Sequence, residues 1–90
     1  AMLESRLMSQ VVAIQTRKAE CGDCLLNQHK PIVISVDYED ERFVAWITVA
    51  CNQMLRSNEV RLVFEVPQLT GRIDCIMRVS SCGLRPVGEN

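Results

Sequence analysis

Histidine, tryptophan and tyrosine each occur once in this 90-residue chain, and aromatic residues make up only 4% of it. The single histidine, His29, has no nucleophile at a plausible spacing, so no acid-base pair can be assigned to it. The chain has only four glycines, and none of them forms a glycine-rich phosphate loop. No complete catalytic motif is present, and we expect a protein that is not an enzyme and that needs no cofactor.

Long apolar runs are missing as well. The longest one near the N-terminus, Val11-Val12-Ala13-Ile14, is far shorter than a signal-peptide core or a membrane span. The five cysteines are an odd number, so they cannot all pair within the chain, which fits a reducing compartment. We therefore expect an intracellular protein, cytoplasmic or nuclear, without a membrane partner.

Charge of one sign does not dominate, because the formal net charge is −1 and charged residues make up 23% of the chain. Nonspecific binding to a polyanion depends on releasing counterions from phosphates, and this balance does not favour it. Apolar residues reach 48%, which is high for a small solvated monomer. These values predict a single domain over residues 1–90 that forms a homo- or heterodimer through its sheet and helix surface.

Two segments have the pattern of strands. Ile32 to Val36 is a β-branched run, and Glu59 to Val66 alternates polar and apolar residues before Pro67 ends it. Between them, apolar residues follow helical spacing, and Asp40 is a suitable N-cap for that helix. The members of this stripe are Phe43, Val44, Ile47, Ala50, Cys51, Met54 and Leu55. The segment therefore predicts strand, helix, strand.

A second helix is expected after Pro67, with Gly83 as its left-handed C-terminal cap. Asp74 and Arg78 would form an ion pair one turn apart on its outer face. Its buried stripe would consist of Leu69, Ile73, Ile76, Met77 and Ser80.

The first thirty residues allow two interpretations. Leu3, Leu7, Val11 and Ile14 fit a helix, whereas the stretch from Gln10 to Lys18 alternates like a strand. We favour a short helical start followed by a strand, with a turn at residues 22–23 that would complete an N-terminal hairpin.

The block from residue 32 to 84 resembles the Alba superfamily of small nucleic-acid-associated proteins. The shared features are a short strand, a helix through Trp46 to Leu55, Asn58-Glu59-Val60 at the start of the second strand, and Gly83 at the end of the second helix. The resemblance implies an α/β fold of the α+β two-layer type, with a strand-helix-strand-helix core and an additional N-terminal strand or hairpin. Where the family has a lysine pair, this chain has Asp40 and Glu41, which would repel phosphate.

Cys21, Cys24 and His29 have the first three ligand spacings of a zinc knuckle. The fourth ligand would fall at Ile34, inside an expected strand, so we assign no metal. The same cysteine pair is a weak candidate for a dithiol, because Pro31 leaves no room for the helix that such a motif precedes. The simplest interpretation is two ordinary cysteines in a turn, and Cys51 and Cys75 are expected to be small apolar fillers.

The candidate nucleic-acid contacts are the five arginines of residues 51–90, a segment that contains four acidic residues. Arginine binds phosphate bidentately and stacks on bases. These arginines are Arg56, Arg61, Arg72, Arg78 and Arg85. The leading hypothesis is thus a non-enzymatic dimeric subunit of an RNA- or DNA-associated assembly. The alternatives are a protein-interaction or regulatory module without nucleic-acid binding, and a zinc or thiol module at Cys21, Cys24 and His29.

Overall fold

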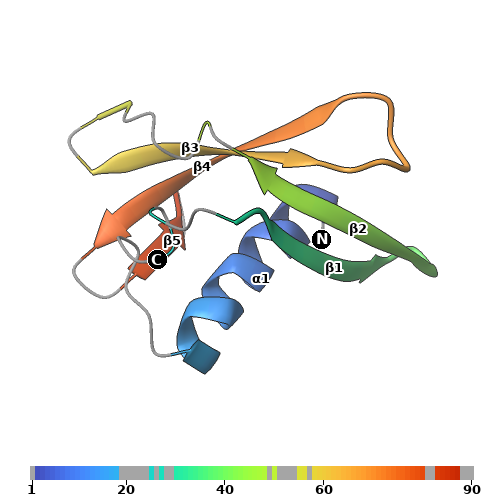
Figure 1. The fold of residues 1–90 in the computed structure, drawn as a ribbon, viewed down its shortest axis with the longest axis horizontal. Coiled ribbons are helices and arrows are strands. Elements are labelled where there is room, and N and C mark those ends of the chain that lie inside the picture. The colour runs from blue at the N-terminus through green and yellow to red at the C-terminus, as the bar shows by residue number, and fades with distance from the viewer. Residues whose placement is uncertain are drawn as a thin grey trace.

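In the described part of the chain, one helix is followed by five antiparallel strands (Figure 1). The computed structural model describes residues 2–18, 25, 27, 30–48, 50, 55–56, 58–80 and 83–87. The elements are α1 (Leu3–Lys18), β1 (Ile32–Tyr38), β2 (Glu41–Thr48), β3 (Glu59–Glu65), β4 (Arg72–Ser80) and β5 (Gly83–Pro86). Each strand pairs with the next along the chain, in the order β1-β2-β3-β4-β5. The sheet curls around α1, so the architecture is mixed α and β as expected (Figure 1).

Helix α1 continues through the segment predicted to be a strand. Its buried apolar residues, Leu7, Val11 and Ile14, are spaced four and three apart, which places them on one helical face toward the sheet. A strand would have placed Val11 and Ile14 on opposite faces. The expectation of a strand over Gln10 to Lys18 was therefore wrong, and the helical alternative was right. The turn expected at residues 22–23 lies outside the described residues.

Strands β1 and β2 form a hairpin around the two-residue turn Glu39 and Asp40. Both turn residues have positive φ, 52° and 61°, as a type I′ turn requires. This turn matches the right-handed twist of the flanking strands, so it joins them directly at the pair Tyr38 and Glu41. The prediction of Asp40 as a helix N-cap was wrong, whereas the predicted strand at Ile32 to Val36 is confirmed.

The helix predicted after residue 40 is strand β2 as far as Thr48, and the described residues Ala50 and Leu55 lie beyond that strand. Phe43, Ala45 and Ile47 point to the core and alternate with the exposed Val44 and Trp46. The outward positions are themselves apolar, so the alternation is hidden in the sequence and the residues also fit a helical stripe. Residues 49 and 51–54 of the predicted helix lie outside the described residues.

The second predicted helix is strand β4. Cys75 and Met77 are buried, whereas Asp74, Ile76 and Arg78 are exposed, which is the alternation of a half-buried strand. Asp74 and Arg78 therefore do not form the expected helical ion pair. Gly83 starts β5 and has a φ of 148°, so it is not a left-handed helix cap. The predicted strand at Glu59 to Val66 is confirmed as β3.

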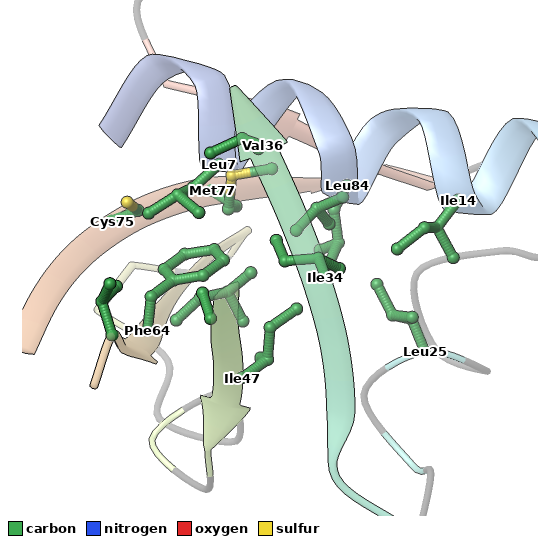
Figure 2. Close-up of a cluster of buried hydrophobic side chains, with 14 of the residues drawn as sticks. Leu7, Ile14, Leu25, Ile34, Val36, Ile47, Phe64, Cys75, Met77 and Leu84 are labelled. Carbon is green, nitrogen blue, oxygen red and sulfur yellow. The ribbon is translucent and has the colours of Figure 1, made fainter. Parts of the chain in front are cut away.

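The hydrophobic core lies between α1 and the concave face of the sheet (Figure 2). Leu7 and Val11 of α1 contribute to it together with Leu62, Phe64 and Met77 of the sheet, all of them with no exposed surface. The other buried apolar members are Ile14, Leu25, Ile34, Val36, Phe43, Ala45, Ile47, Val60, Val66, Cys75 and Leu84. Every strand turns one face to this core. The residues on the opposite faces of the strands together form the outer face of the sheet.

Candidate functional site

Four of the five candidate arginines lie on the outer face of the sheet. Arg61 is half-buried opposite Ile76, and Arg72 lies opposite Glu65 at the far end of the same strand pair. Arg78 and Arg85 face each other across β4 and β5. The side chains of all four alternate with the buried residues of their strands, so they project from the surface opposite α1.

Three of the candidate arginines are next to acidic groups. Arg61 Nε lies 4.0 Å from Asp74 Oδ2, and Arg72 Nε lies 3.8 Å from Glu65 Oε1. Arg56 precedes β3, and its Nε lies 3.9 Å from Glu59 Oε1. Exposed pairs of this length contribute about 0–1 kcal/mol to stability. Their main effect here is to reduce the positive potential around Arg56, Arg61 and Arg72.

Arg78 and Arg85 are the exception. They are direct cross-strand neighbours, both are exposed, and neither forms an ion pair with another described residue. Like charges in direct opposition are unfavourable in a sheet. The acidic residue in register with them is Glu59, opposite Arg78, and its carboxylate is also next to Arg56. The pair therefore leaves an excess of positive charge at this end of the sheet.

An apolar patch occupies the other end of the outer face. Val33 and Trp46 are opposite each other on β1 and β2 and are 49% and 43% exposed, and Val44 lies beside them. A hollow of about 640 Å³ next to this patch is lined by Trp46, Leu69 and Arg72, among others. The sequence analysis placed Val44 and Trp46 in a helix. A strand predicted over this segment would have placed Val44 and Trp46 together on the face opposite the core and so would have indicated this patch.

The cysteine candidates divide into described and undescribed positions. Cys75 is buried, and its pKa is raised to about 12 by burial, with smaller effects of the acidic groups of Glu4 and Asp74. Such a thiol is protonated and unreactive at neutral pH. Cys21, Cys24 and His29 lie outside the described residues, so the zinc and thiol hypothesis stays a prediction. Within the described part of the chain, no group of three acidic, cysteine or histidine residues is placed to hold a metal.

Among the residues that the structure describes, no helix has both the length and the apolar character needed to cross a bilayer. Comparisons with known proteins find no matching family model, curated protein or solved structure. The candidate site is therefore interpreted from its own residues.

Proposed function

We propose that this protein is a non-enzymatic subunit of a nucleic-acid-associated assembly and that the outer face of its sheet contacts phosphate. The observation that supports this best is the direct opposition of Arg78 and Arg85, neither of which forms an ion pair with another described residue. Each guanidinium group has a fork of N–H donors that fits phosphate oxygens, and the register places the two arginines on neighbouring strands. A bound phosphate would also remove the repulsion between the two arginines.

The contact is expected to be weak and shared with other subunits. Two phosphate contacts predict a slope of log affinity against log salt of about −1.5, which is small for a nucleic-acid-binding protein. The net charge of −1 adds no long-range attraction. Membership of the Alba superfamily, with its strand-helix-strand-helix core, stays a prediction, and the segments aligned with its two helices contain strands β2 and β4.

Replacing Arg78 and Arg85 by alanine together should abolish most of this binding. We expect affinity for a 20-nucleotide single strand to fall about tenfold at 50 mM salt, with loss of most of the salt dependence. Fluorescence anisotropy with labelled RNA and DNA strands, repeated up to 200 mM salt, measures both quantities.

Arg61→Ala with Arg72→Ala is the matched control, because it removes the same formal charge from the same face. These two arginines already face Asp74 and Glu65, so the control should retain most of the affinity. Equal losses in the two double variants would show that only net charge matters. Absence of binding by the unmodified protein would eliminate the proposed contact and favour a protein-interaction module.

The patch of Val33, Val44 and Trp46 supports that second candidate, an interaction module without nucleic-acid binding. Exposed apolar side chains that cluster on one face are typical of protein contact surfaces. This patch lies at the opposite end of the outer face from Arg78 and Arg85, so the two functions are separable by substitution.

The dimer expected from the composition gives a direct test of this patch. We predict a dimer at micromolar concentration in sedimentation velocity, and Trp46→Glu should convert it to monomer because a charge would be buried in the contact. Ile76→Glu is the control, since Ile76 is an exposed apolar residue on the same face, 39% exposed, but outside the patch. If the unmodified protein is a monomer, the dimer prediction is wrong. If Ile76→Glu alone produces monomer, the dimer interface lies around Ile76 and not at the patch.

A further inference from the structure

A groove of about 720 Å³ follows the edge of β1 and separates this strand from α1. In Figure 1, α1 passes across β1 in the view and lies on the concave side of the sheet. The lining comprises Gln10, Ile14, Arg17 and Lys18 of α1, Leu25, and Lys30 to Asp37 with Arg42 from the hairpin. Its volume lies within the range of roughly 300–1,000 Å³ that is typical of ligand sites.

The β1 edge has backbone groups that point away from β2. β1 pairs with β2 on one side, and none of the described strands pairs with its other side. In a two-residue hairpin the pair next to the turn, Tyr38 and Glu41, exchanges backbone hydrogen bonds, and such pairs alternate along the ladder. The N–H and C=O groups of Val33, Ser35 and Asp37 therefore point away from β2.

Two independent contacts agree with this alternation. Arg6 Nη1 in α1 donates to the carbonyl oxygen of Asp37 at 3.2 Å, which requires that carbonyl to face outward. On the other side of the hairpin, Gln68 Nε2 donates to the carbonyl oxygen of Arg42 at 2.6 Å, and the N–H of Val44 donates to Gln68 Oε1 at 3.1 Å. These β2 residues are the partners of Asp37 and Ser35, so the register is consistent on both edges.

Helix α1 makes different contacts with the backbone of the two edge strands, β1 and β5. At β5, the side-chain amide of Gln15 accepts the N–H of Leu84 at 2.7 Å and donates to its carbonyl oxygen at 3.1 Å, which closes that edge. At β1, the Arg6 contact closes one end only. No described residue donates to or accepts from the outward backbone groups of Val33 or Ser35. An unpaired edge of this kind is a template for another strand.

The charges around the groove indicate which side chains a strand bound there would have. Arg17, Lys18 and Lys30 line it, and none of them forms a salt bridge within the described part of the chain. Among the described lining residues the one acidic side chain is that of Asp37, whose Oδ1 lies 3.1 Å from Arg42 Nε. The groove is therefore positive toward the C-terminal end of α1 and complementary to carboxylates.

We propose that this groove binds an extended, acidic segment of a partner protein, which pairs with β1 as a sixth strand. Its backbone bonds with Val33 and Ser35, in the manner of strand addition to a sheet edge. Acidic side chains of the segment contact Arg17, Lys18 and Lys30. This binding uses neither Arg78 nor Arg85, so it is independent of the proposed phosphate contact.

A synthetic eight-residue peptide tests the proposal. Its sequence alternates valine and threonine over five residues and ends in three glutamates, and the control peptide has lysines in place of the glutamates. In a ¹⁵N-labelled titration of the full chain, the amides of Val33 and Ser35 should shift and become protected from exchange with the acidic peptide. The lysine peptide should bind about tenfold more weakly, because its charges oppose those of the groove.

Two variants separate backbone pairing from charge. Val33→Pro removes an outward N–H on an edge strand, where proline is tolerated, and should weaken the peptide about tenfold or more, whereas Val33→Ala keeps the N–H and should bind within about twofold of the original. Arg17→Glu should weaken it about fivefold, and Arg56→Glu, an equal change of charge outside the groove, within about twofold. If Val33→Pro does not fold, the comparison of Arg17→Glu with Arg56→Glu still tests the proposal.

Several results would overturn the proposal. The first is that the acidic peptide does not bind. The second is that Val33→Pro and Val33→Ala lose the same peptide affinity while Arg17→Glu leaves it unchanged. The third is that the acidic and lysine peptides bind equally well. Protection of the Val33 and Ser35 amides in the free protein would also overturn it. If that protection depends on protein concentration, a second copy of the chain occupies the edge. If it does not, another segment of the same chain occupies it.

Discussion

Met77→Ala is expected to lower the free energy of unfolding by about 2–5 kcal/mol, because it leaves a cavity at a fully buried position. Ile76→Ala, at the adjacent residue, should cost about 1 kcal/mol or less, since Ile76 is 39% exposed on the outer face and loses mainly strand propensity. Urea unfolding of both variants, followed by circular dichroism, measures the difference.

This pair of neighbours distinguishes a strand from the helix predicted from the sequence. A helix with the predicted stripe would bury Ile76 and Met77 together, and both substitutions would then be costly. A strand buries only one of two successive residues. Met77→Leu keeps the volume and should cost less than about 1.5 kcal/mol, which shows that the loss in Met77→Ala comes from the cavity. Similar costs for Ile76→Ala and Met77→Ala would contradict the β4 register.

Gln15→Leu is expected to lower the free energy of unfolding by about 2–4 kcal/mol, because it leaves two buried backbone groups without partners. Gln15 is 4% exposed, and its amide forms both hydrogen bonds to the backbone of Leu84. Gln10→Leu makes the same change in α1 at a partly exposed position and should cost about 0.5 kcal/mol or less. Chemical denaturation gives both values, and hydrogen exchange should show that the Leu84 amide loses protection in Gln15→Leu alone.

Gly83 belongs to the same contact. A Cβ atom there would lie 2.7 Å from Gln15 Oε1, and the φ of 148° is one that residues with side chains rarely adopt. The close approach of the Gln15 amide to β5 thus depends on glycine at this position. If Gln15→Leu proved as mild as Gln10→Leu, water would be able to replace the amide and α1 would not close the β5 edge.

Local pattern was sufficient for part of the fold. The spacing of Leu7, Val11 and Ile14 indicated a helix, although it competed with an alternation that favoured a strand from residue 10. The β-branched run of β1 and the alternation of β3 predicted both strands directly. In α1 the spacing of the apolar residues is helical, whereas the β-branched residues of β1 and the period-two alternation of β3 are typical of strands.

The pattern failed in β2 and β4, where an outward apolar residue also fits helical spacing. In β2, the outward Val44 falls on a helical stripe with Phe43 and Ile47. In β4, Ile76 does the same with Ile73 and Met77. Pairing energy decided these cases, because each segment is flanked by strands whose backbone groups need partners, and the turn at Glu39 and Asp40 delivers the chain antiparallel to β1.

By itself the sequence determined that this chain is a mixed α and β protein with an N-terminal apolar helical stripe, two strands, and no complete catalytic motif. It also identified the arginines, but not their arrangement. Only the tertiary structure decided that Arg78 opposes Arg85 and that Gln15 contacts the backbone of β5. It also decided that the outward backbone groups of Val33 and Ser35 lie along a basic groove without a partner among the described residues. The physical reason is that these features depend on strand register and on the curl of the sheet around α1, which bring together residues as far apart as Gln15 and Leu84.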